Sequence, residues 1–497
     1  MEKFDLCILG GGPAGYAAAM RAIDLGKKVI LVEKDKVGGA GVYNGALSSK
    51  TLWELSQKVY AVNKTVVSTG RQKFEISWEE VRRTMNEAIF DRKFQYSCHL
   101  KLLQTETEEI VFRYERGFGK MLNPNQVEVT KHSGEKKIFY SENLIIATGS
   151  HASKLPNVAI DEKIIMTSDG IHQIEDFPKS LVIVGAGVVG CEFATIFSNF
   201  GKTKVYLLDR AERILPFEDE DVAKLVADNL QEKGVEIFHS VTLEYMSHKD
   251  GGVEFEVSLP DGTREIMQVE KAMISVGRSP NVKNIGMEEA GVKMSKRGVH
   301  IGDDDTKTNI PNIYAVGDVT GRVALVNMGE LEARHAVELM FKQTMEKLSY
   351  DNISSIMFLD PEVAGVGMSE QDCHDKNIAV KVVRIDYSCI ARAIAMRKTQ
   401  GFFKIIVTND KEMKILGMRA VGEHASSAIQ GVALLIKMNM GISVLAELVH
   451  PHPSIIEGIQ ECVRMLMNKS IFKSSVFKDK LKCYSCVDGV CTPLQRL

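Results

Sequence analysis

The fold is decided by two stretches of sequence: residues 5–34, DLCILGGGPAGYAAAMRAIDLGKKVILVEK, and residues 179–210, KSLVIVGAGVVGCEFATIFSNFGKTKVYLLDR. Each begins with an apolar strand pattern, turns through closely spaced glycines, continues as a helical pattern and ends in a second apolar run closed by an acid. This order of elements is typical of a βαβ unit, whose two strands are parallel. The sequence therefore predicts an α/β protein with two parallel-sheet domains.

The first glycine turn predicts a dinucleotide site. Gly10, Gly12 and Gly15 follow a strand and open a helix, and Glu33 closes the next strand. Glycines at this spacing permit a tight turn, a close approach of the backbone to a pyrophosphate and close helix packing. The phosphates would then face a helix N-terminus, where N–H groups and the helix dipole favour anions. The acid at the end of the second strand is placed to accept hydrogen bonds from ribose hydroxyls.

The second stretch repeats every feature, with Gly185, Gly187, Gly190 and Asp209 at the corresponding places. A carboxylate at Asp209 would bond a ribose 2′-hydroxyl and repel a 2′-phosphate, which favours NAD over NADP. Arg210 and Arg213 argue the other way, because a nearby guanidinium could accommodate that phosphate.

Composition limits the kinds of partner. The 497 residues are 44% hydrophobic and 26% charged, with a formal net charge of -3, which gives no electrostatic reason to expect a nucleic acid or an anionic membrane. No apolar run approaches the roughly 20 residues of a membrane-spanning helix. The chain passes from Met1 directly into a strand pattern, so we expect a cytoplasmic protein, although a leader removed during maturation would leave the same sequence.

Four further motifs accompany the glycine turns: LIIATG at 144–149, SVGRSPN at 275–281, IYAVGD at 313–318 and HPHPSIIE at 450–457. With them, the chain over about residues 1–470 resembles the flavoprotein pyridine nucleotide-disulfide oxidoreductases, most closely the dihydrolipoamide dehydrogenase branch. The resemblance implies FAD in the first glycine site, NAD in the second with NADP less favoured, and a homodimer formed through the C-terminal domain.

The resemblance and the chain's patterns together predict four regions. Residues 1–150 and 275–348 would form the FAD-binding domain, and residues 151–274 the NAD(P)-binding domain. Residues 349–470 would form an α+β dimerisation domain. Residues 471–497, with four lysines and three cysteines, are expected to be a mobile tail.

The resemblance also assigns site residues. Around FAD it places Gly119, Thr148, Gly149, Asp318 and the run Ala324, Leu325, Val326 and Asn327, with Gly277 as a further cofactor-binding residue. Lys50 would lie near the flavin and pair with Glu192, where a cation would stabilise the negative charge of reduced flavin. His452, oriented by Glu457, would move protons in the partner subunit's active site.

One motif departs from the family. The disulfide reductases carry two cysteines in a G-G-x-C-x-x-x-G-C-x-x-S-K stretch, whereas this chain reads GGAGVYNGALSSK at 38–50, with Gly41 and Ala46 at the two positions. Neither residue can form a thiolate, so direct thiol-disulfide exchange at that place is excluded. The histidine–glutamate pair would then have no neighbouring sulfur to serve.

Three hypotheses about the protein's reaction remain, and they differ in where the electrons go. In the first, Cys483 and Cys486 of the tail form a redox pair that replaces the missing disulfide, with Lys480 and Lys482 lowering a thiol pKa. In the second, the chain is a soluble transhydrogenase that passes hydride between nicotinamides. In the third, it is a flavoprotein subunit without turnover. The acceptor in the first reading is a small molecule or a protein-bound group, and no metal site is expected from three cysteines with one C-x-x-C.

Overall fold

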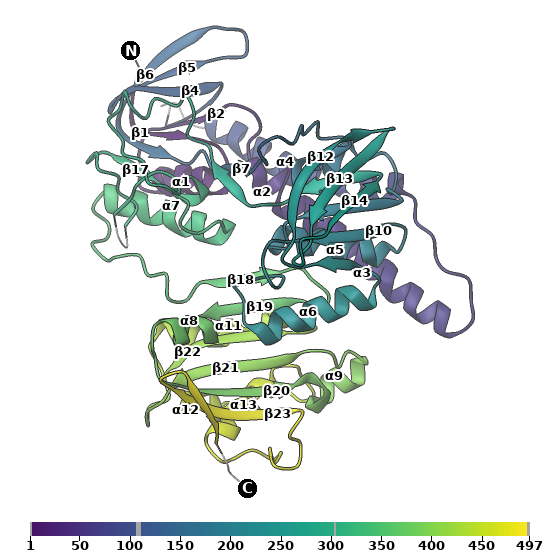
Figure 1. The fold of residues 1–497 in the computed structure, drawn as a ribbon. Helices are drawn as coiled ribbons and strands as arrows, with labels where there is room; N and C mark the ends of the chain where they lie inside the picture. The colour runs from purple at the N-terminus through teal and green to yellow at the C-terminus, as the bar shows by residue number, and fades with distance from the viewer. Residues whose placement is uncertain (1, 106–110, 303–304, 495–497) are drawn as a thin grey trace. The chain divides into compact units, whose positions relative to one another are not determined.

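A computed structural model describes residues 2–105, 111–302 and 305–494 (Figure 1). The chain divides into two compact units. The first comprises residues 1–178, 245–254 and 268–349, and the second comprises residues 179–244, 255–267 and 350–497. Strands β12 (Thr242–Lys249), β13 (Gly252–Ser258) and β14 (Arg264–Val269) contribute residues to both.

The first unit is built on a mainly parallel sheet. Strands β3, β2, β1 and β6 lie side by side in that order, and β17 pairs with the far edge of β6. An antiparallel pair, β5 and β4, continues from the first half of β6. The strands are β1 (Lys3–Leu9), β2 (Val29–Glu33), β3 (Phe112–Arg116), β4 (Phe118–Asn123), β5 (Gln126–Thr130), β6 (Lys136–Ile146) and β17 (Ile313–Ala315).

Because side chains alternate along β1, residues of this strand contribute to two core clusters, one on each face of the sheet. Leu6 and Ile8 pack with the alanine-rich faces of α1 and α7, whereas Cys7 and Leu9 pack on the opposite face with residues of β4, β5 and β6. Both faces are covered, which explains why β2 is buried at every position. The helices are α1 (Pro13–Asp24), α2 (Gly39–Val42), α3 (Ala46–Ser68), α4 (Trp78–Thr105) and α7 (Val326–Met340).

The remaining elements of the first unit are short. They are β7 (Ser150–Ala152), β8 (Ile165–Thr167), β15 (Lys271–Ile274), β16 (Arg278–Pro280) and the 3-10 turns η1 (Ser168–Gln173) and η2 (Gly317–Thr320). Strand β7 pairs with β16, and β8 pairs with β15. The pairing of β7 with β16 brings the residues that follow LIIATG together with the second half of SVGRSPN.

The second unit contains the second βαβ pattern and a larger antiparallel sheet. Strands β9 (Ser180–Val184), β10 (Lys204–Leu208) and β11 (Glu236–Phe238) are parallel neighbours, joined by α5 (Val188–Phe200) and α6 (Glu220–Glu232). The antiparallel sheet has the order β18-β19-β22-β21-β20-β23-β24. Its strands are β18 (Ser354–Met357), β19 (Val363–Gly367), β20 (Val380–Asp386), β21 (Phe402–Thr408), β22 (Ile415–Val421), β23 (Leu481–Val487) and β24 (Val490–Pro493).

Helices pack against this antiparallel sheet. A core cluster joins β20, β21 and β22 to α10, α11 and α13, and includes Phe403, Ile459 and Leu481. The helices of this part are α8 (Glu370–Asp375), α9 (Ala391–Met396), α10 (Ala425–Ala428), α11 (Gln430–Lys437), α12 (Ser443–Ala446) and α13 (Glu457–Leu466), with the 3-10 turn η3 (Tyr387–Cys389).

The expectation of a mobile tail is wrong for residues 481–493, which form β23 and β24. Strand β23 pairs with β20 through six residues, from Ile385 opposite Leu481 to Val380 opposite Cys486, and β24 folds back on β23. Leu481 is 2% exposed. Backbone pairing and one buried leucine therefore attach this segment to the sheet edge, despite its lysines.

Candidate functional site

The first glycine turn has the geometry that a dinucleotide requires. Gly10 adopts φ +107, a conformation that favours glycine, and Gly12 is the N-cap of α1. A side chain at Gly15 would overlap the carbonyl oxygen of Gly10, so this position holds the helix close to the turn. At Gly12, in contrast, an added Cβ would meet nothing within 4 Å.

Glu33 is held at this turn by backbone donors. The N–H of Gly11 donates to Glu33 Oε2 at 2.6 Å, and the N–H of Asp35 donates to Oε1 at 2.8 Å. A carboxylate has about four acceptor sites, so these two bonds orient Glu33 and leave capacity for ribose hydroxyls.

The second turn repeats this arrangement. Gly185 adopts φ +102, and Gly187 is the N-cap of α5 with open space beside its Cα. The N–H of Ala186 donates to Asp209 Oδ2 at 2.5 Å, and the N–H of Ala211 donates to Oδ1 at 2.8 Å. Gly190 lies buried in the first turn of α5. The open backbone at Gly12 and Gly187, beside an oriented acid, fits the pyrophosphate and ribose of a dinucleotide at both turns.

Asp318 lies at a junction of three segments of the first unit. Its Oδ2 accepts from Ser150 Oγ at 2.6 Å, and Arg278 Nε lies 3.7 Å from the same oxygen. Arg278 Nε also donates to Ser150 Oγ at 2.7 Å. Ser150 and Arg278 were not singled out from the sequence, although Arg278 lies inside SVGRSPN.

The two motifs around residues 148 and 281 are bonded directly. Thr148 Oγ1 donates to the carbonyl of Asn281 at 2.7 Å, and Asn281 Nδ2 donates to the carbonyl of Thr148 at 2.9 Å. Gly149 at φ +67 and Gly277 at φ +108 both have open space where a Cβ would stand. These backbone positions are accessible to a ligand.

Gly119 has a different environment. A Cβ built there would stand 2.7 Å from Leu9 Cδ2 and 3.1 Å from Val32 Cγ1, so glycine at this position lets β4 pack against the core. Its packing role is evident, and its contact with a cofactor stays a prediction.

The residues expected around the flavin lie at the starts of two helices in the first unit. Leu325 is the N-cap of α7 and Val326 begins the helix, with Ala324 and Asn327 exposed beside them. Lys50 lies in the first turns of α3, where its Nζ donates to Ser49 Oγ at 3.3 Å. In the second unit, Glu192 is 3% exposed and accepts from the N–H of Phe358 at 3.1 Å. The pairing of Lys50 with Glu192 stays a prediction.

The stretch that carries cysteines in the family is packed for a residue without a side chain. Gly41 lies in α2, and a Cβ at this position would stand 2.6 Å from Pro13 Cγ and 3.8 Å from Val326 Cγ2. Ala46 begins α3. A cysteine at residue 41 would therefore require Pro13 to move.

His452 and Glu457 form a dyad in the second unit. Glu457 Oε1 lies 2.8 Å from His452 Nδ1, and Glu457 Oε2 accepts from the N–H of Ser454 at 2.8 Å. Partial burial raises the pKa of Glu457, but the hydrogen bonds from Ser454 and His452 outweigh it and leave this pKa below its usual value. The His452 side chain is 72% exposed. With Nδ1 facing Glu457, Nε2 is the nitrogen available to exchange a proton with another molecule.

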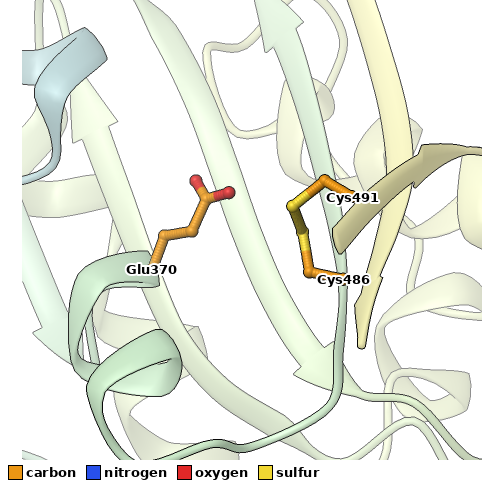
Figure 2. A group of neighbouring side chains, drawn as sticks. All are labelled: Glu370, Cys486 and Cys491. Atoms are coloured by element: carbon orange, nitrogen blue, oxygen red, sulfur yellow. A yellow bond between two sulfur atoms is a disulfide. The ribbon is translucent and has the colours of Figure 1, made fainter. Parts of the chain in front are cut away.

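The expected pairing of Cys483 with Cys486 is wrong. The disulfide joins Cys486 to Cys491, which stand opposite each other on β23 and β24 (Figure 2). Cys483 keeps its thiol and packs against the core on the other face of β23. Cys486 lies three positions after Cys483, and strand alternation places residues at this spacing on opposite faces.

Comparisons with known proteins cover nearly the whole chain. The family model for pyridine nucleotide-disulphide oxidoreductases matches residues 4–333, and the model for their dimerisation domain matches residues 353–463. Dihydrolipoyl dehydrogenase from Zymomonas mobilis is 31% identical over 468 residues, with 93% of this chain and 97% of the relative covered. The enzyme of the same name from Geobacillus stearothermophilus is also 31% identical, with 94% and 97% covered.

Solved structures share the fold. The HOCl-induced flavoprotein disulfide reductase RclA from Escherichia coli, solved as a Cu(II) complex, has a TM-score of 0.81 at 25% identity, with 94% of this chain and all of that chain covered. LpdA from Mycobacterium tuberculosis has a TM-score of 0.84 at 23% identity, with the same coverage. Among the described residues, no helix is long and apolar enough to cross a membrane.

Proposed function

Because this chain belongs to the pyridine nucleotide-disulphide oxidoreductase family, we propose that it passes hydride between NAD(H) and FAD without a redox disulfide at residues 41 and 46. Family membership makes it an FAD-dependent oxidoreductase. FAD, when bound, supplies a ring system that exchanges hydride with nicotinamide. The observation that carries the proposal is the pair of matched turns, in which Glu33 and Asp209 are each held by two backbone N–H groups.

The protein's own residues would bind the two cofactors and place a positive charge near the flavin. Gly12 and Gly187 have open space where a Cβ would stand, which would let a pyrophosphate approach each turn, and Asp318 accepts a hydrogen bond from Ser150 beside Arg278. Lys50 would supply a positive charge near the flavin. Gly41 has no thiol, and Pro13 occupies the space beside it. Electrons would therefore leave the flavin for a small-molecule or protein-bound acceptor.

We infer a preference for NAD over NADP. The Arg213 guanidinium donates to the carbonyls of Glu218 at 2.7 Å and Pro216 at 3.2 Å, so its own loop occupies its donors. Asp209 keeps its carboxylate oriented at the ribose position. We expect flavin reduction to be faster with NADH than with NADPH at equal concentration. Asp209→Ala should reduce the difference between these two rates.

We infer a homodimer formed through the C-terminal domain. Leu434, Met438 and Val449 are 56%, 57% and 91% exposed around α11 and α12, an apolar surface that a soluble monomer would leave in water. The dimerisation-domain match covers these residues. In a dimer of this family, the His452 and Glu457 dyad would serve the partner's flavin. Location in the cytoplasm stays a prediction.

An anaerobic NADH titration tests the proposal. A flavin alone stores two electrons, so we expect full bleaching at one NADH per FAD. Storage of four electrons that falls to two in Cys486→Ser with Cys491→Ser would mean that the C-terminal disulfide belongs to the electron path. Failure of NADH to reduce the bound flavin would overturn the proposal.

The absence of thiols at residues 41 and 46 also favours a second candidate, the transhydrogenase. Hydride would then pass from one nicotinamide to flavin and on to another nicotinamide. NADPH-dependent reduction of an NAD analogue, at a rate comparable with flavin reduction, would support this candidate over other acceptors.

A further inference from the structure

The C-terminal hairpin builds a site outside the family's domains. The dimerisation-domain match ends at residue 463, whereas β23 and β24 span residues 481–493 and add two strands beyond β20. Between this hairpin, α8 and the start of α6 lies a cavity of about 1300 Å³, whose lining includes Glu370, Lys404, Tyr484, Cys486 and Cys491. All of these residues belong to the second unit.

Two sulfurs and a carboxylate converge in this cavity. Figure 2 shows Glu370 pointing from α8 toward the disulfide of Cys486 and Cys491. One ligand atom from each of the three residues lies within 4.8 Å of the others. In a tetrahedral zinc site with bonds of about 2.0–2.3 Å, ligand atoms stand roughly 3.5–3.8 Å apart. After reduction, rotation of the two cysteine side chains would have to separate the sulfurs to this spacing, with a Glu370 carboxylate oxygen already within 4.8 Å of both.

The backbone would keep the two cysteines together after reduction. Cys486 and Cys491 are register partners on antiparallel strands, and β23 is also paired with β20. The Cα atoms of Cys486 and Cys491 are 4.0 Å apart in the disulfide-bonded hairpin, and cross-strand partners without a covalent bond stand about 4.5–5.5 Å apart at Cβ. Reduction thus exposes two neighbouring thiols on a fixed hairpin.

Glu370 is oriented by second partners, as metal-binding carboxylates commonly are. Tyr484 Oη donates to its Oε1 at 2.7 Å, and Lys404 Nζ donates to its Oε2 at 3.2 Å. Ser369 caps α8 and fixes the helix on which Glu370 is the first residue.

The local charge allows a cation beside Lys404. Lys404 is 2% exposed and lies 3.0 Å from Asp219 Oδ2 and 2.6 Å from Asp221 Oδ1. Its charge is already matched by these carboxylates before Glu370 is counted. Arg384 Nε lies 3.8 Å from Asp221 Oδ2 and shares that carboxylate. Reduction adds two neutral thiols, and the two thiolates that form when a metal displaces their protons supply the negative charge that a divalent cation favours.

We propose that Cys486, Cys491 and Glu370 form a redox-gated site for one zinc-class divalent cation. A dithiol reductant passes two electrons and two protons to the disulfide and becomes a disulfide itself. The metal then displaces the two thiol protons and binds two sulfurs and one carboxylate oxygen, and a water completes the coordination. In the reverse exchange, a small-molecule disulfide accepts the two electrons, takes up two protons and becomes two thiols, while the two cysteine sulfurs rejoin and release the cation. This inference does not depend on the proposed hydride transfer.

The test uses the full-length holoprotein, either oxidised or reduced with a dithiol that is then removed under anaerobic conditions. Each sample is dialysed against buffered zinc alone, and zinc per chain is measured by elemental analysis. We expect one more zinc per chain in the reduced protein, and two fewer thiols titrating when zinc is present. Flavin absorbance checks that each sample remains folded.

Variants locate the site. Cys486→Ser and Cys491→Ser should each lose the extra zinc, and Glu370→Gln should weaken its binding at least tenfold. Cys483→Ser is the matched control, because it removes a thiol from the same strand but on the opposite face, and it should keep the zinc. Equal zinc in oxidised and reduced protein, or equal loss in Cys483→Ser and Cys486→Ser, would overturn the proposal.

Discussion

Single glycines of the first turn have two separable roles. Gly15 is closed in by the carbonyl of Gly10, whereas Gly12 faces open space. Gly15 therefore limits how closely the helix packs on the turn, and Gly12 limits what can approach the turn from outside.

This difference predicts opposite results for two alanine substitutions. Gly15→Ala should lower the free energy of unfolding of the FAD-free protein by roughly 1–3 kcal/mol, because a methyl group has no room. Gly12→Ala should leave that stability nearly unchanged but weaken FAD binding at least tenfold, because its methyl would occupy the pyrophosphate's place. Thermal unfolding and fluorescence titration with FAD measure the two effects. FAD binding by Gly12→Ala as tight as that of the unaltered protein would contradict the assignment.

The His452 and Glu457 dyad predicts a pH dependence of stability. The pKa of Glu457 is lower in the folded protein than in the unfolded chain, so its ionised form stabilises the fold above the ordinary carboxyl pKa of about 4.3. That contribution is lost as the pH falls through the folded value. Glu457→Gln should therefore cost more stability at pH 7 than at pH 3. Chemical denaturation at both values tests this expectation, with exposed Glu447→Gln as the control.

Among the elements, the C-terminal hairpin differs most from what the sequence pattern predicts. Four lysines in residues 471–497 indicate a mobile segment, and the C-x-x-C spacing indicates a redox pair, whereas the structure shows two paired strands. The sequence also contains Asp488-Gly489 between two apolar residues, a strong signal for a two-residue hairpin turn, and this signal would have placed Cys486 opposite Cys491. That β20 would offer a free edge could not be predicted, because edge positions depend on the order of strands in the finished sheet.

Attachment of the hairpin can be measured through one residue. Leu481 is 2% exposed in the core beneath β20, so Leu481→Ala should cost about 2–4 kcal/mol. Val487 on the same strand is 43% exposed, and Val487→Ala should cost less than about 1 kcal/mol. Similar, small losses at both positions would mean that the hairpin is detached in solution.

Across the whole molecule, the parts of the site contained in one short stretch could be predicted from the sequence, whereas the parts formed by distant segments could not. The two glycine turns with Glu33 and Asp209 were predictable, because each is contained in about 30 consecutive residues. The hydrogen bonds that join Ser150 to Asp318 and to Arg278 were not, since each connects segments more than 100 residues apart. The same holds for Glu370 beside Cys486 and Cys491, where α8 and the hairpin meet only in the folded unit.

The apolar surface around α11 and α12 predicts the oligomeric state. Leu434→Glu with Met438→Glu should convert the dimer to monomers and lower turnover at least tenfold, because the dyad would no longer reach a partner's flavin. Sedimentation velocity measures the first effect and steady-state assay the second. Ile266→Glu, an equally exposed apolar position at 61%, is the control and should stay dimeric. Full activity in a monomer would contradict the shared active site.

The matched turns at Glu33 and Asp209 have a consequence for how the holoprotein is assembled. FAD and NAD share an adenosine diphosphate half, and in the proposed function each turn would bind that half through an open glycine and an oriented acid. The common fragment should therefore occupy both places, and two equivalents of ADP should saturate the flavin-free chain. Discrimination between the cofactors would come from their other halves, the flavin and the nicotinamide. An excess of NAD should then slow reconstitution with FAD, because NAD would occupy the first glycine turn in place of FAD. A protein with a single nucleotide-binding fold has no such competition between its own two cofactors.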